Sequence, residues 1–190
     1  MVLGDKIIVT SHHHLYYPSQ IAILDHQGRL LREYWHPGQL NALATGTYQG
    51  KAAVYVGGVS NVHDRMGATL VVLDPETLAG AAVEHGKPSF DGMPPGVELA
   101  RVVFPRSVLS IHERYNGVNS IFSRDGRVIA HVHERLTGSA QPSIQYHFND
   151  RLELEQVVVS DVFAAEYRKT LHHDMTPEDR DALHRLTRIQ

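Results

Sequence analysis

The sequence contains no cysteine, which excludes disulfide bonds, thiolate zinc sites and a cysteine nucleophile together. It also has no run of about 18 apolar residues, so we expect no membrane insertion. No signal peptide is visible, and the cytoplasm is therefore the default compartment. A net charge of -3 without a long basic run argues against a nucleic-acid partner. Nucleophile-elbow, dinucleotide-binding and HExxH motifs are all missing, which argues against the enzyme classes that carry them.

The residues that are present indicate strands. Of the 190 residues, 42% are hydrophobic, which suits one globular domain. They occur in short runs or alternations bounded by Gly, Asp, Asn or Pro, the pattern of strands. Hairpin turns are expected at His26–Gly28, Asp125–Gly126 and Asn149–Asp150. We predict an all-β fold of mainly antiparallel hairpins, arranged as propeller blades or as a sandwich, with a short C-terminal α-helical segment.

Two regions follow from this pattern. Residues 1–160 are predicted to form a β-repeat domain of about two to three blade-like units. Within it, the Gly- and Pro-rich segment 82–98 is predicted to be a surface loop outside the core. Residues 161–190 are predicted to form a helical extension that packs on the β domain. A helix start at Thr176–Asp179 supports it, followed by an apolar helical stripe of Ala182, Leu183, Leu186 and Ile189.

The stretch "ATGTYQGKAAVYVGG", residues 44–58, superficially resembles a phosphate-binding loop. Such a loop needs four residues between its glycines and a hydroxyl residue after the lysine, because the hydroxyl holds Mg²⁺. Here three residues separate Gly46 from Gly50, and Ala52 follows Lys51. We therefore reject nucleotide binding at this stretch, which we expect to be a turn and a strand.

Three signatures carry a family resemblance: Tyr34–Gly38, Gly57–Val59 and Leu73–Pro75. Through them the chain, from about residue 6 onward, resembles FG-GAP/VCBS-like (integrin-type) β-propeller repeats. More closely, it is similar to the propeller-like C-terminal regions of acidobacterial-type soil bacteria. The resemblance implies blade-like sheets, but fewer of them than the four to eight of a closed propeller. We therefore expect an apparently truncated member that closes as a sandwich or associates with another copy.

In such repeats a calcium loop, Asp-x-Asp-x-Asp-Gly, commonly precedes the strand. The matching positions here are Thr45, Thr47 and Gln49, followed by Gly50. All three carboxylates are replaced, and calcium affinity depends on ligand charge. The resemblance therefore implies a degenerate calcium loop, so we expect no cofactor and no stabilisation of the fold by added Ca²⁺.

Histidine supplies the remaining candidates for chemistry. His131 and His133 are two apart on an expected strand, so both imidazoles point to one face and can share a metal ion. A third ligand would have to be His112, His147 or Glu134. The alternative is an ordinary solvated face of the sheet. The other clusters of histidine and aromatic residues are interpreted as structural. These are His12–His14, His172–His173, and Tyr16, Tyr17, Tyr34, Trp35 and His36.

Taken together, these features favour a non-catalytic binding, sensory or assembly module of β-propeller-repeat type. A protein partner or self-association is expected, no catalytic residue is assigned, and the sequence points to no particular small-molecule ligand. The alternative is a His-rich metal-binding protein or a metal-dependent hydrolase that uses the histidine face.

Overall fold

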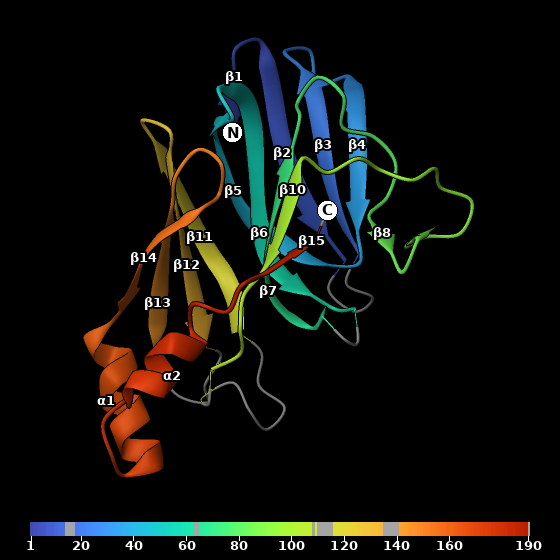
Figure 1. Cartoon of the computed structure of the whole chain (residues 1–190). Coiled ribbons are helices and arrows are strands. Elements are labelled where there is room, and N and C mark those ends of the chain that lie inside the picture. The colour runs from blue at the N-terminus through green and yellow to red at the C-terminus, as the bar shows by residue number, and fades with distance from the viewer. Residues whose placement is uncertain (14–17, 63–64, 108, 110–115, 135–140, 190) are drawn as a thin grey trace.

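The computed structural model describes residues 1–13, 18–62, 65–107, 109, 116–134 and 141–189. Most of these residues lie in antiparallel strands, and the helices are confined to the C-terminal part (Figure 1). The predicted all-β class with a short C-terminal helical segment is confirmed. The strands form three larger sheets, called here the first, central and third sheets.

Each sheet is built mainly from neighbouring strands. The first sheet contains, in spatial order, β1 (Val2–Leu3), β2 (Lys6–His12), β3 (Ser19–Asp25) and β4 (Leu30–His36). The central sheet contains, in the order β15-β10-β7-β6-β5, the strands β5 (Gly38–Tyr48), β6 (Lys51–Ser60), β7 (Gly67–Leu73), β10 (Ala100–Val103) and β15 (Thr187–Ile189). The third sheet contains β11 (Asn116–Arg124), β12 (Arg127–Glu134), β13 (Ser143–Phe148) and β14 (Leu154–Val159). A small hairpin, β8 (Val83–Glu84) and β9 (Lys87–Pro88), lies outside them.

The tight turns follow local sequence chemistry. Asp125 and Gly126 join β11 to β12 with φ values of 51° and 74°. Gln49 and Gly50 join β5 to β6 with φ values of 50° and 75°. A two-residue turn with both φ values positive matches the twist of the flanking strands, which is why Gly is favoured at its second position. The predicted turns at Asp125–Gly126 and at Gly50 are confirmed.

The central sheet is buried on both faces. On one side it shares a core cluster with the first sheet, which includes Ile8, Ile21, Ile23, Leu40, Val54, Val56, Val71 and Leu73. On the other side it shares a larger cluster with the third sheet, which includes Tyr55, Leu70, Val72, Val118, Val132, Tyr146 and Phe148. Successive side chains of a strand point to opposite faces, so β6 and β7 supply residues to both clusters and are apolar along their length. The result is a stack of three sheets.

The contacts between sheets are made mainly through β5 and β11. Strand β5 contacts β2 and β3 of the first sheet, and β11 of the third sheet contacts β5, β6 and β7. Gly57 on β6 makes the second approach possible. A Cβ atom at this position would lie 2.6 Å from Cγ1 of Val118 on β11, well inside van der Waals contact. Val118 therefore packs directly against the backbone of β6, in space that a side chain at position 57 would otherwise fill.

The connection between β7 and β10 runs along the free edge of β4. The backbone N–H of Trp35 donates to the carbonyl of Gly80 at 2.9 Å, and the N–H of Ala82 donates to the carbonyl of Trp35 at 2.8 Å. The predicted surface segment 82–98 is mostly exposed or half-buried, but Ala82 and Glu84 within it are buried. This connection therefore protects an edge strand and also contributes to the core.

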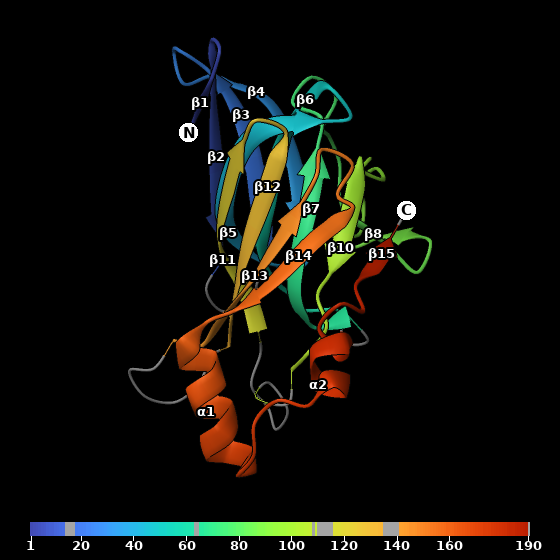
Figure 2. The ribbon, with the colours of Figure 1, turned by 60° about the vertical axis from the view of Figure 1, so that its left-hand side comes forward.

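The C-terminal part contains two short helices, as a helical extension predicts, and then a strand that was not expected. Helix α1 (Asp161–Leu171) buries Phe163 and Tyr167 in the larger cluster, and α2 (Pro177–Ala182) begins with the predicted Thr176–Asp179 capping box. The predicted helical stripe through Leu186 and Ile189 is wrong, because α2 ends at Ala182 and the chain becomes β15. Both helices lie beyond one end of the strands, and β15 runs beside β10 (Figure 2).

Candidate functional site

Three histidines share the outer face of the third sheet. His131 lies opposite Gln145 in the ladder, and His147 lies opposite Ile129. The side chains at 129, 131 and 133 are half-buried, whereas their neighbours at 128, 130, 132 and 134 are buried. The predicted common face of His131 and His133 is therefore present, and His147 lies on the same face.

The surroundings of His131 favour its neutral form. Partial burial, together with the charges of His133 and His147, lowers the pKa of His131 below its usual value. The ring of Phe122 on β11 meets the His131 ring edge to face, with centroids 5.2 Å apart. His147 Nε2 lies 3.1 Å from Oε1 of Gln145. This face combines an exposed aromatic ring with imidazoles that hydrogen-bond to amides.

The metal prediction at His131 and His133 gains no third ligand from the described residues. No group of three His, Asp or Glu side chains in the described ranges is placed to hold a metal ion. Glu134 points to the inner face, where its Oε1 accepts a hydrogen bond of 2.6 Å from Ser107. His112 lies outside the described residues. The metal site stays a prediction.

The other histidine and aromatic candidates fall into different environments. Tyr34 and His36 are fully buried, and Trp35 packs edge to face on Phe90 with centroids 6.3 Å apart. His172 adopts the left-handed conformation that ends α1, and its N–H donates to the carbonyl of Arg168. His12 and His13 are exposed. Tyr16, Tyr17 and His14 lie outside the described residues.

The positions matched to calcium ligands lie in a strand and its turn. Thr45 and Thr47 belong to β5 and pair with Val54 and Ala52 of β6, and Gln49 opens the two-residue turn. Thr45 and Thr47 therefore lie in extended backbone that is paired with β6, and this segment forms no loop that could wrap an ion. Residues 44–58 therefore form an ordinary hairpin.

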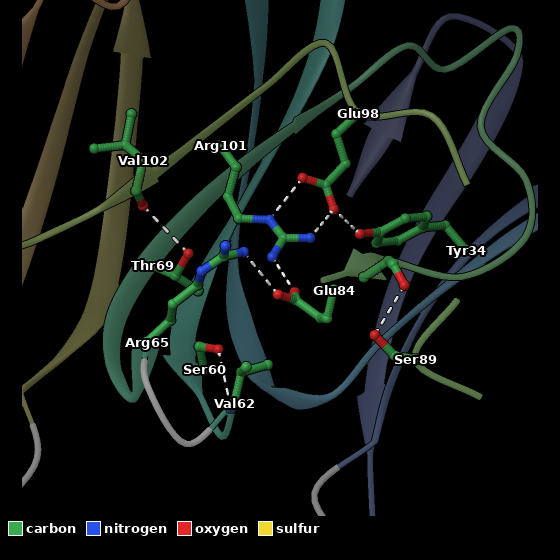
Figure 3. A network of polar contacts seen from close by, with 11 residues as sticks. Tyr34, Ser60, Val62, Arg65, Thr69, Glu84, Ser89, Glu98, Arg101 and Val102 are labelled. Carbon is green, nitrogen blue, oxygen red and sulfur yellow. Dashed lines mark hydrogen bonds and ion pairs between the residues drawn. The ribbon is translucent and has the colours of Figure 1, made fainter. Parts of the chain in front are cut away.

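A buried network centred on Arg101 is the main polar feature that sequence reasoning missed (Figure 3). Arg101, on β10, is 3% exposed and points toward the first sheet in the row Val56–Val71–Arg101. Its guanidinium makes a fork with Glu98, including an Nε–Oε2 contact of 2.7 Å, and also binds Glu84.

Two further residues complete the Arg101 network. The hydroxyl of Tyr34 donates to Glu98, and Arg65 Nη1 donates to Oε2 of Glu84 at 3.0 Å. Burial disfavours the charge on Arg101, but hydrogen bonding and the charge of Glu98 outweigh it and raise its pKa above the ordinary value. Two cations, two carboxylates and the Tyr34 hydroxyl thus connect β4, β10 and the β6–β7 and β7–β10 connections.

An open pocket lies beside this network. It measures about 280 Å³ and is lined by Val83, Gly96, Val97, Glu98, Arg101 and Ile189. The guanidinium of Arg101 is already bonded to two carboxylates, so its charge is neutralised before any ligand arrives. The network therefore acts as a clamp between segments of the fold, and the pocket offers no free cation from Arg101.

His36, at the end of β4, is fully buried beside this network. Within the described residues neither of its ring nitrogens has a hydrogen-bond partner. Burial, and then the charge of Arg101, holds the pKa of His36 well below its usual value near 6.5. The unfolded chain therefore binds a proton at this residue before the folded chain does.

We expect the free energy of unfolding to fall as the pH drops below about 6.5, the value for an unfolded histidine, with a limiting slope of about 1.4 kcal/mol per pH unit for one proton. Urea denaturation at a series of pH values measures this slope. His36→Phe should flatten it between pH 6.5 and 5, whereas His26→Asn, at an exposed position, should leave it unchanged. Equal slopes in wild type and His36→Phe would contradict the assignment.

The outer face of the first sheet carries an apolar row across all four strands. Ladder pairing places Val2, Ile7, Leu24 and Leu30 side by side. The next row contains Val9, Ala22 and Glu33. Val2, Leu30 and Val9 are 69%, 53% and 39% exposed, respectively. Exposed apolar side chains gathered on one sheet face are typical of an interaction surface.

Comparison with protein-family models, with curated proteins and with solved structures found no match. Among the described residues, none of the helices is long and apolar enough to cross a membrane. A function for this protein is therefore proposed from the surfaces of its own fold.

Proposed function

We propose that this protein is a non-catalytic assembly module of β-propeller-repeat type, and that the outer face of the first sheet is its contact surface. The single observation that carries the proposal is the apolar row Val2–Ile7–Leu24–Leu30 on that face. Burying exposed apolar side chains contributes roughly 25 cal/mol per Å², which favours association through this face.

Two features of the fold support the propeller-repeat part of the proposal. Each of the three sheets is mainly an antiparallel meander, and the three stack face to face in chain order. Contacts between sheets centre on β5 and β11, the first strands of the central and third sheets. Blades of four antiparallel strands in chain order have this meander arrangement. A stack that ends in two sheets leaves two outer faces for partners.

Sedimentation velocity over a range of protein concentrations tests the assembly role. Wild type is expected to self-associate as concentration rises. The double variant Val9→Ser, Leu30→Ser should shift association to concentrations at least about tenfold higher, because it removes apolar contact area without altering the core. Val97→Ser is the matched control, since Val97 is 70% exposed but lies in the β7–β10 connection. A wild type that stays monomeric at every concentration overturns the proposal.

The rival function is metal binding or metal-dependent hydrolysis at the histidine face. The specific observation in its favour is that His147 joins His131 and His133 on one face of the third sheet. Elemental analysis of protein purified without a chelator separates the two proposals. A stoichiometric transition metal that is lost in a His131→Ala, His133→Ala variant would favour the rival.

A further inference from the structure

The two ends of the sheet stack present different outer faces. The first-sheet face consists of the rows Val2–Ile7–Leu24–Leu30, Val9–Ala22–Glu33 and Ser11–Gln20–Trp35. The third-sheet face includes the rows Phe122–Ile129–His147–Gln156 and Ser120–His131–Gln145–Val158, with His133 on one side of them and Arg124–Arg127 on the other. Both are faces of four-stranded antiparallel sheets that cover no other sheet among the described residues.

We propose that the first-sheet face of one copy packs against the third-sheet face of a second copy. This inference rests on the proposed assembly function and names the partner and its contact surface. The apolar groups that would meet are Val9 and Leu30 on one side, and Phe122 and Ile129 on the other. Phe122 is 56% exposed, so a large aromatic side chain is free to enter the contact.

Charge favours this pairing over a contact between like faces. The rows of the first-sheet face contain one carboxylate, Glu33, and no basic residue. The third-sheet face contains the imidazoles of His131 and His147, and beside Phe122 and Ile129 the pair Arg124–Arg127. Its carboxylates, Asp125 and Glu155, are already bound to these two arginines. Two first-sheet faces would bring carboxylates together, whereas a first-sheet face on a third-sheet face offers Glu33 the N–H donors of imidazole.

Geometry within the chain supports the same arrangement. The central sheet already has the first sheet on one face and the third sheet on the other, so face-to-face stacking is how these sheets cover their apolar sides. A contact between unlike faces is heterologous. Because the two faces lie on opposite sides of the stack, each copy can bind one neighbour through each face, so that copies add head to tail.

Complementary variants test the pairing by sedimentation velocity. Val9→Lys places a charge on the first-sheet face, and Phe122→Glu places one on the third-sheet face. Each variant alone should remain monomeric at concentrations where wild type associates, with the dissociation constant raised at least about tenfold. An equimolar mixture should form a 1:1 complex, because each variant keeps the face that the other has lost. Circular dichroism checks that both variants are folded, and Val162→Lys, at an exposed position on α1, is the charge-matched control.

The remaining outcomes distinguish the pairing of these two faces from the assembly function itself. If Phe122→Glu associates as wild type does while Val9→Lys does not, the pairing is overturned and the assembly function stands. If the two variants fail to complement each other in the mixture, the pairing is likewise overturned. A wild type that is monomeric at every concentration overturns both. Loss of association in Val162→Lys would show that added charge alone disrupts association, and would also overturn the pairing.

Discussion

Arg101→Met is expected to lower the free energy of unfolding by about 3–5 kcal/mol, the range for removing one partner of a buried ion pair. The substitution keeps most of the side-chain volume but leaves Glu98 and Glu84 facing each other without the guanidinium. Glu98 then retains only the hydroxyl of Tyr34, and Glu84 retains Arg65. Chemical denaturation at fixed protein concentration measures the loss.

Arg127→Met is the matched control for Arg101→Met. Arg127 is 75% exposed, and its Nε lies 3.6 Å from Glu155. Exposed ion pairs contribute little, so this change should stay within about 0.5 kcal/mol of wild type. Adding Glu84→Gln and Glu98→Gln to Arg101→Met should recover part of the loss, because the uncompensated charges are then removed. Similar effects for Arg101→Met and Arg127→Met would contradict the role of the network.

Gly57→Val should destabilise the protein by about 1–3 kcal/mol or more, because it inserts a branched side chain between the central and third sheets. The added Cβ alone would lie 2.6 Å from Cγ1 of Val118 and 3.1 Å from Cδ1 of Ile121. Both neighbours belong to β11, so relief requires that strand to move away from β6. The midpoint of thermal or chemical unfolding reports the effect.

A double-mutant cycle isolates the contact between Gly57 and Val118. Gly57→Ala introduces only the clashing methyl group, and Val118→Ala removes the methyl groups it meets. We expect Gly57→Ala to cost less in the Val118→Ala background, with a coupling of about 0.5–3 kcal/mol. Additive effects would mean that the two sheets are not held at this distance by Gly57.

Local sequence chemistry accounts for the parts of the fold that could be predicted. The hairpin turns at Asp125–Gly126 and Gly50 depend on two adjacent residues, and the helix start at Thr176–Asp179 depends on a four-residue capping box. The C-terminal strand had no such signal. Leu186 and Ile189 fit a helical stripe as well as a strand, and the choice depends on β10, which lies far away in the sequence.

The candidate site was less predictable because its residues meet only after folding. Alternation correctly placed His131 and His133 on one face, since that depends on strand period alone. The Arg101 network joins side chains from β4, from the β6–β7 and β7–β10 connections and from β10, and no spacing along the chain indicates it. His36 likewise follows two aromatic residues, and nothing local shows that it is buried next to a guanidinium. Long-range pairing decides both cases.

The pairing of β15 with β10 also sets an order of events during synthesis. The first sheet and the hairpin β5–β6 are made from early, contiguous segments, so they can pair while the rest of the chain is still being translated. The central sheet is completed only when residues 187–189 have left the ribosome and reached β10. Until β15 pairs with it, the β10 edge is open to other strands, so this short strand closes off a route to aggregation.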